Sequence, residues 1–236
     1  RQDKMFDIFQ EHHRWQNLLG MSTVGTFNEA VNQGHTIDII NLSEALQEKK
    51  IAKIAENIAH ESRVKMVLIA GPSSSGKTTF AHRMTIALKV HGLRPVKLSL
   101  DDYYRNRGEL TREPDGSLDL ERLDTLDVAL LCDHLPRLLA GKEVQMPEYD
   151  FKTGTRMERT HPLRVEAGQP IIIEGIHGLN EALTQSVPRS MKFKIYISAL
   201  TMLNLDDHNR IRTTDIRLLR RLVRDKQFRH SPFEET

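Results

Sequence analysis

The segment that decides the fold is Val64-Lys65-Met66-Val67-Leu68-Ile69-Ala70-Gly71-Pro72-Ser73-Ser74-Ser75-Gly76-Lys77-Thr78-Thr79, an apolar run that leads into a glycine-bounded loop. The apolar run is typical of a buried strand, and the residues from Lys77 onward have the pattern of a helix. Gly71 and Gly76 stand five positions apart and are followed by Lys77 and Thr78, which is the spacing of a phosphate-binding loop. The alternative, a chance glycine-serine turn, is disfavoured by the strand before the loop and the helix after it.

Each part of this predicted loop has a distinct role. Backbone N–H groups and the positive end of the helix converge on phosphate oxygens. Lys77 brings a charge to the outer phosphates and is therefore also predicted to be catalytic, and the Thr78 hydroxyl is placed to hold Mg²⁺. No Asn-Lys-x-Asp segment for reading guanine occurs in the chain, which favours ATP over GTP. The predicted cofactor-binding residues are Gly71, Ser73, Ser74, Ser75, Gly76, Lys77, Thr78 and Thr79.

From Val64 onward, short apolar runs alternate with helical segments, which indicates an α/β fold with a parallel sheet flanked by helices. The chain up to about Glu61 is different, with short mixed segments and an amphipathic helix from Ser43, so we predict a small α+β N-terminal segment. The predicted domains are 1–61 and 62–236. The predicted strands are 64–70, 95–100, 170–174 and 193–197, and the predicted helices are 77–91, 127–140 and 214–227.

Carboxylates follow two of the predicted strands, at the sheet edge where open α/β proteins bind ligands. Asp101 stands in Leu98-Ser99-Leu100-Asp101-Asp102-Tyr103-Tyr104 and could orient or deprotonate an attacking hydroxyl; a turn-capping role is the alternative. Glu174 ends the third strand and could support Mg²⁺ or its waters, with a surface turn as the alternative. The predicted metal site comprises Thr78, Asp101 and Glu174.

Arginines repeat at helical spacing near the C-terminal end of the chain. Arg217, Arg220 and Arg224 recur at intervals of three and four residues and form a cationic face that could close over a transferring phosphate. We predict catalytic roles for Arg220 and Arg224. The alternative is an ordinary solvated charged face.

The composition of the chain argues against some classes of binding partner. The 236 residues include 34 Lys and Arg against 32 Asp and Glu, a net charge of +2, which provides no strong global attraction to nucleic acid or anionic membrane. The apolar runs are far shorter than the roughly 20 residues of a membrane-spanning helix. The single cysteine, Cys132, excludes an internal disulfide and agrees with a cytoplasmic location. The start at Arg1 and the end soon after the arginine-rich helix predict a C-terminally truncated chain.

The segments Gly71–Thr78, Leu98–Tyr104, Met146–Phe151, Ile173–Gly175 and Arg220–Asp225 together resemble the uridine kinase and phosphoribulokinase family. The resemblance covers about 64–229 and implies ATP-dependent phosphorylation of an alcohol on a small molecule. It implies that Asp101 is the catalytic base, that Tyr104 lines the acceptor pocket, that the arginine-rich helix is a lid and that Glu121 contacts the sugar.

Within that family, the layout resembles a longer uridine kinase-like subgroup whose N-terminal extension is similar to threonyl-tRNA synthetase accessory regions. Tyr149 and Phe151 could stack on a base. Gly154 stands where uridine kinases carry a base-reading histidine, so the acceptor stays open. Arg156 keeps its family position. The predicted substrate-binding residues are Tyr104, Glu121, Tyr149, Phe151, Arg156 and Arg217.

Three functions follow from these observations. The leading hypothesis is phosphorylation of a nucleoside 5′-hydroxyl, with Asp101 as base. The second is a kinase for another sugar or small alcohol, which remains an alternative because Gly154 replaces the base-reading histidine. The third is a nucleotide-controlled module that binds RNA or a partner without turnover, although the balanced charge argues against nucleic acid. We expect a small-molecule acceptor, no membrane partner and a homo-oligomer.

Overall fold

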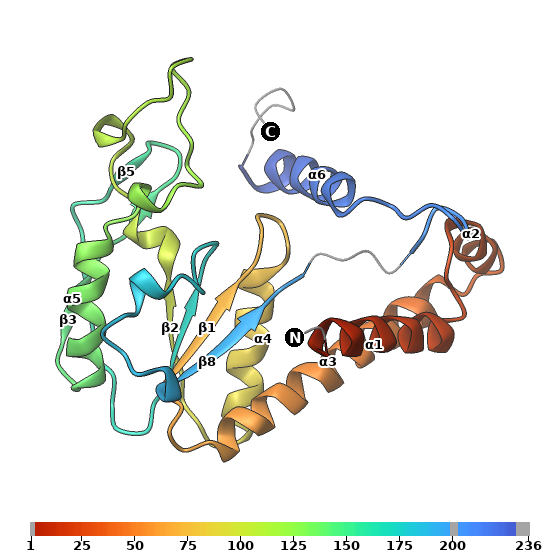
Figure 1. The fold of residues 1–236 in the computed structure, drawn as a ribbon, viewed down its shortest axis with the longest axis horizontal. Helices are drawn as coiled ribbons and strands as arrows, with labels where there is room; N and C mark the ends of the chain where they lie inside the picture. Colours follow the sequence, from red (N-terminus) through yellow and green to blue (C-terminus); the bar gives the residue numbers. More distant parts are fainter. Residues whose placement is uncertain (1–2, 199–202, 230–236) are drawn as a thin grey trace. The chain divides into compact units, whose positions relative to one another are not determined.

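The structure is a computed structural model that describes residues 3–198 and 203–229 (Figure 1). Its contacts group the chain into two units. The larger unit contains residues 54–198, and the smaller contains the described residues up to 53 and those after 202. Each unit is described by itself.

A four-stranded parallel sheet forms the centre of the larger unit, in the order β2-β7-β1-β8. This sheet confirms the predicted α/β fold, and its strands begin and end close to the predicted positions because each is a short apolar run between turn residues. The strands are β1 (Met66–Ala70), β2 (Val96–Ser99), β7 (Ile171–Glu174) and β8 (Lys192–Tyr196).

Helices α4 (Lys77–Val90) and α5 (Val128–Leu139) lie on either side of this sheet (Figure 1). Every residue of β1 is buried, because successive side chains of a central strand point to opposite, covered faces. One face contributes Met66 and Leu68 to a core cluster. The same cluster includes three leucines of α5, namely Leu131, Leu135 and Leu138.

Two small hairpins follow α5. One pairs β3 (Val144–Met146) with β6 (His161–Leu163), and the other pairs β4 (Tyr149–Asp150) with β5 (Thr155–Arg156). The second hairpin carries two of the three predicted acceptor aromatics, Tyr149 and Phe151. Short 3-10 turns complete the unit, at Leu100–Tyr103, Arg107–Glu109, Leu123–Thr125, Glu181–Leu183 and Arg189–Met191.

The smaller unit is helical where we predicted a small α+β segment. Extended pairing in its described part is limited to single-residue bridges, including one between Thr23 and Asn204. Thr23 instead begins a helix, because its hydroxyl accepts a hydrogen bond from the Thr26 N–H and Thr26 reciprocates in a capping box. The third N-terminal helix begins at Thr36 rather than near Ser43. The helices are α1 (Asp3–Leu19), α2 (Val24–Asn32), α3 (Thr36–His60, which continues into the larger unit) and α6 (Thr213–Arg224, followed by a π-turn at Asp225–Arg229).

None of the described helices is long and apolar enough to cross a membrane. The predicted division near Glu61 stays a prediction, and the contact-based boundary lies instead between Lys53 and Ile54, within α3.

Candidate active site

The carboxyl ends of the parallel strands bring the predicted nucleotide and acceptor residues to one edge of the sheet. Glu174 at the end of β7 lies in register between Ile69 of β1 and Ser99 of β2. The phosphate loop leaves β1 just beyond Ile69, and Asp101 lies two residues beyond Ser99. The register therefore places a buried carboxylate between the two segments that the sequence analysis assigns to nucleotide and acceptor.

The loop from Gly71 to Gly76 is a closed turn that leads into α4. Ser74 and Gly76 have left-handed φ values of 59° and 93°, so consecutive N–H groups turn inward as in an anion-binding nest. Lys77 Nζ donates to the Pro72 carbonyl oxygen over 3.0 Å and so folds back over the loop. Ser75 Oγ is buried and has no hydrogen-bond partner among the described residues. A ligand rich in oxygen atoms, such as a polyphosphate, fits this arrangement.

Gly71 admits no larger residue. A Cβ built on it would lie 2.5 Å from the Ile197 carbonyl oxygen and 2.9 Å from Ser75 Oγ. The first neighbour is backbone that follows β8, so the loop rather than the neighbour would have to move.

We expect Gly71→Ala to weaken ATP binding roughly tenfold, because overpacking of about 1–3 kcal/mol would displace the phosphate loop. Calorimetric titration with ATP measures the Kd. Gly108→Ala is the matched control, since a Cβ at Gly108 meets nothing within 4 Å. Equal Kd values for the two variants would show that the loop tolerates the side chain.

Three oxygen-bearing side chains gather where the loop meets β7. Thr78 Oγ1 donates to Glu174 Oε1 over 3.0 Å, although the two residues are 96 positions apart. The Glu174 side chain is buried, and burial followed by the nearby Asp101 carboxylate raises the pKa of Glu174. Because the charged form is disfavoured, a cation arriving between these oxygens would relieve an electrostatic cost already present in the protein.

The donor set suits Mg²⁺ rather than an ion caged entirely by protein. Among residues 3–198 and 203–229, no three His, Cys, Asp or Glu side chains gather closely enough to hold a metal. Mg²⁺ needs only one or two carboxylates when phosphate oxygens and water complete its shell. Glu174 with the Thr78 hydroxyl, and Asp101 within electrostatic range, fits that requirement.

The predicted acceptor aromatics form one cluster. The ring centroids of Tyr104 and Tyr149 are 5.5 Å apart, and the Phe151 ring lies 5.8 Å from Tyr104 and 5.1 Å from Tyr149. Tyr104 and Tyr149 are buried, whereas Phe151 is 38% exposed. Burial, then the carboxylates of Asp101 and Glu121, raise the pKa of Tyr104. Asp101 is therefore electrostatically coupled to the aromatic cluster as well as to Glu174.

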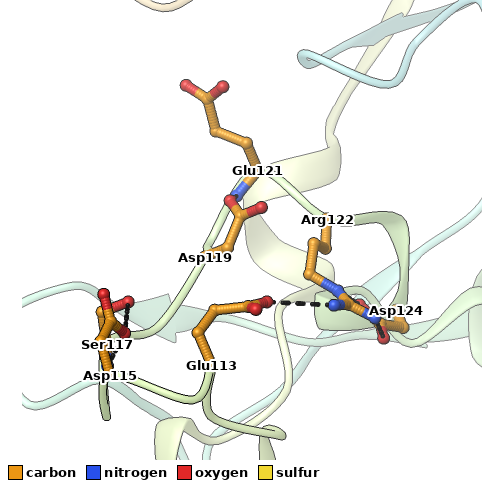
Figure 2. Close-up of polar contacts among 7 residues, drawn as sticks. All are labelled: Glu113, Asp115, Ser117, Asp119, Glu121, Arg122 and Asp124. Carbon is orange, nitrogen blue, oxygen red and sulfur yellow. Dashed lines mark hydrogen bonds and ion pairs between the residues drawn. The ribbon is translucent and has the colours of Figure 1, made fainter.

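Glu121 lies on the long loop that precedes α5. The loop is held by ion pairs from Arg122 to Glu113 and to Asp124, at 3.1 and 2.9 Å. Figure 2 shows the Glu121 side chain pointing away from these pairs, and no dashed line joins it to another residue drawn. The Tyr104 hydroxyl donates to the carbonyl oxygen of the preceding Leu120 over 3.1 Å. Glu121 thus follows a residue that is bonded to the aromatic cluster, and its sugar contact stays a prediction.

The side chain of Arg156 uses its hydrogen-bond donors within the protein. Its Nε and Nη2 donate to the carbonyl oxygens of Tyr104 and Tyr103 at 2.9 and 3.0 Å, and its Nη1 pairs with Asp127 at 3.1 Å. These bonds tie the β4–β5 hairpin to the segment that follows Asp101. We infer that Arg156 positions the acceptor aromatics, a role that the sequence pattern alone did not indicate.

Asp102 is a second positioning residue, which the sequence analysis passed over in favour of Asp101. Burial, then the nearby Asp101 carboxylate, raise the pKa of Asp102, and the backbone N–H of Tyr149, which favours the charged form, opposes them. The adjacent aspartates therefore have different surroundings: Asp102 lies near the Tyr149 backbone of the hairpin, while Asp101 acts electrostatically on Glu174 and Tyr104. Only the contacts of the folded chain separate them.

The predicted lid arginines lie on α6 in the smaller unit. Arg220 is exposed, Arg217 is half-buried, and Arg224 Nε donates to the buried Asp225 carboxylate over 2.7 Å. The pairing with Asp225 fixes the end of the helix. Closure of these arginines over the phosphate loop stays a prediction.

The family model described as "Phosphoribulokinase / Uridine kinase family" matches residues 66–235. A uridine kinase of Lactobacillus johnsonii is 35% identical over 161 residues, which are 68% of this chain and 67% of the relative. A uridine kinase of Macrococcus caseolyticus is 31% identical over 173 residues, 73% of this chain and 74% of the relative. A solved structure described as a possible uridine kinase from Bacillus stearothermophilus has the same fold, with a TM-score of 0.52 and 24% identity over 63% of this chain and 79% of that one.

Proposed function

This chain belongs to the phosphoribulokinase and uridine kinase family, and from that premise we propose that it phosphorylates the 5′-hydroxyl of a uridine- or cytidine-like nucleoside. The family makes it an ATP-dependent phosphotransferase. The observation that carries the proposal is the position of Asp101, which lies two residues beyond Ser99, the register partner of Glu174, and three residues before Tyr104 of the aromatic cluster. A catalytic base must lie between the bound ATP and the acceptor hydroxyl, and this position meets that requirement.

In the proposed reaction, the acceptor lies against Tyr149 and Phe151 with its hydroxyl at Asp101. The hydroxyl oxygen attacks the γ-phosphorus in line and its proton passes to the Asp101 carboxylate, while the bond from phosphorus to the β-γ bridging oxygen breaks. The products are a nucleoside monophosphate and ADP. Lys77 and the loop N–H groups stabilise the charge that spreads over the transferring phosphate. Arg220 and Arg224 are proposed to add to this from the lid.

Mg²⁺ is proposed to be held by Thr78 and Glu174, with Asp101 in its outer surroundings. When bound, the ion neutralises phosphate charge. Glu174 is already oriented by its hydrogen bond from Thr78, so these residues need little rearrangement to receive it.

Several finer predictions accompany the proposal. Glu121 contacts the sugar, and Arg217 contacts the acceptor from the lid. The chain forms a homo-oligomer and is cytoplasmic. The region before Glu61 is the tail of an extension similar to threonyl-tRNA synthetase accessory regions.

The test is ADP formation with Mg²⁺ and ATP across uridine, cytidine, adenosine, guanosine and simple sugar alcohols, with products identified by mass spectrometry. Turnover that depends on a pyrimidine nucleoside and yields its monophosphate supports the proposal. Turnover with a sugar alcohol alone would favour the second hypothesis. ATP binding without stimulation by any acceptor would overturn both kinase hypotheses in favour of a binding module, which salt-sensitive RNA binding would then identify.

A further inference from the structure

The side chain of Arg107 lies across Gly154, in the turn of the β4–β5 hairpin. A Cβ built on Gly154 would lie 2.4 Å from Arg107 Cδ and 2.7 Å from its Nε. Gly154 also has a φ of +70°, in the left-handed region that favours glycine. The Arg107 N–H donates to the Gly154 carbonyl oxygen over 2.9 Å, so the two backbones are joined as well. The arginine therefore fills the space that a side chain at position 154 would need.

The guanidinium of Arg107 is only partly used by the chain. Nη2 donates to the Phe151 carbonyl oxygen over 3.1 Å, which is its one side-chain hydrogen bond within the described residues. Nε is buried without an acceptor there, and no ion pair between Arg107 and a carboxylate is found among the described residues. Arg156, on the same hairpin, has all three of its nitrogens bonded. A half-buried cation with unused donors is costly unless something else satisfies it.

The guanidinium lies beside the backbone of Phe151, one member of the aromatic cluster. Phe151, whose carbonyl oxygen holds Arg107, is the most exposed ring of the three and contacts both Tyr104 and Tyr149. A flat base stacked on Phe151 would bring its polar edge toward this guanidinium. An arginine side chain has only hydrogen-bond donors. It can therefore donate to a carbonyl oxygen on a base, but it cannot form a hydrogen bond with an amino group, which is also a donor.

We propose that Arg107 is a specificity-determining residue that donates to a carbonyl oxygen on the acceptor base, so that the enzyme selects uridine over cytidine. This inference rests on the proposed nucleoside kinase function. The two pyrimidines differ at this edge, because uracil has a carbonyl oxygen where cytosine has an amino group. A site that hydrogen-bonds one of these groups discriminates strongly against the other, since the mismatch leaves a buried polar group unpaired.

The test measures kcat/KM for uridine and cytidine in the natural chain, Arg107→Gln and Arg107→Lys. We expect the natural chain to favour uridine by roughly tenfold or more. Arg107→Gln should bring the ratio close to one, because an amide both donates and accepts. Arg107→Lys keeps a donor and should preserve part of the preference. Arg105→Gln is the control, because Arg105 is an exposed arginine of the same segment and should leave the ratio unchanged.

The ratio of the two kcat/KM values distinguishes a role of Arg107 in base selectivity from a role in supporting the hairpin structure. If Arg107 only supported the hairpin, Arg107→Gln would lower both values equally, and an unchanged ratio would overturn the inference. Equal use of both nucleosides by the natural chain, or a preference for cytidine, would overturn it while leaving the nucleoside kinase proposal intact. If neither nucleoside stimulates ADP formation, both proposals fail together.

Discussion

Asp101→Asn is expected to lower acceptor-dependent kcat by about 10²–10⁴-fold while the Kd for ATP stays nearly unchanged. The amide has the size of the carboxylate but cannot take up the hydroxyl proton. Asp101 follows β2 and lies outside the phosphate loop, so we expect the loss in the chemical step rather than in nucleotide binding. Single-turnover kinetics with saturating ATP and acceptor measure the effect, and calorimetry measures the Kd.

The neighbouring aspartate provides the matched control for this experiment. Asp102→Asn keeps an oxygen that can accept from the Tyr149 N–H, so the hairpin should stay in place and kcat should change little. A similar loss in both variants would show that the segment matters only structurally. If saturating Mg²⁺ restores the kcat of Asp101→Asn, then Asp101 acts mainly as a metal ligand rather than as the base.

Glu174→Gln is expected to have opposite effects on activity and on stability. Activity should fall by about 10²-fold, because the site loses the carboxylate proposed to hold Mg²⁺. The Tm of the ligand-free protein should rise by about 2–4 °C near neutral pH, which corresponds to about 1 kcal/mol in a chain of this size. Glutamine still accepts the Thr78 hydrogen bond and carries no charge into the buried site beside Asp101.

The pH dependence of this stability difference has a definite sign. The pKa of Glu174 is higher in the folded chain than in the unfolded chain, so the folded state holds its proton more tightly. Its contribution to stability is fully present below the unfolded pKa and is lost as the pH rises through the folded pKa. The Tm advantage of Glu174→Gln should therefore be absent in acid, grow as the pH rises, and level off. Mg²⁺ with ATP should narrow the difference, because it stabilises the natural chain preferentially.

Glu181 offers a control of opposite sign for the Glu174 experiment. Hydrogen bonds from Lys192 and Lys194 lower the pKa of Glu181 to about 2. Its favourable contribution is present above the unfolded pKa and is lost as the pH falls toward 2. Glu181→Gln should therefore leave activity unchanged and lower the Tm slightly, if at all, at neutral pH. A rise in Tm for Glu181→Gln, or a fall for Glu174→Gln, would contradict the electrostatic account.

The parallel sheet and the phosphate loop could be predicted from local sequence, because both have strong local signals. The glycine spacing, the lysine and the hydroxyl residue follow one another in the chain, and the apolar runs of the strands are short and clearly bounded. Asp101 and Glu174 could be found in the same way, since each comes at the end of a predicted strand. The N-terminal helices were less predictable because their apolar pattern is weak, and Thr36 gives little sign that a helix begins there.

The contacts of the site residues become visible only in the folded chain. The sheet register brings Glu174 to Thr78, the bonds of Arg156 make it a positioning residue, and the turn at Gly154 admits Arg107. The physical reason is that these contacts join residues far apart in the chain. They depend on strand register and on the path of loops, and no local pattern of residue types records either one.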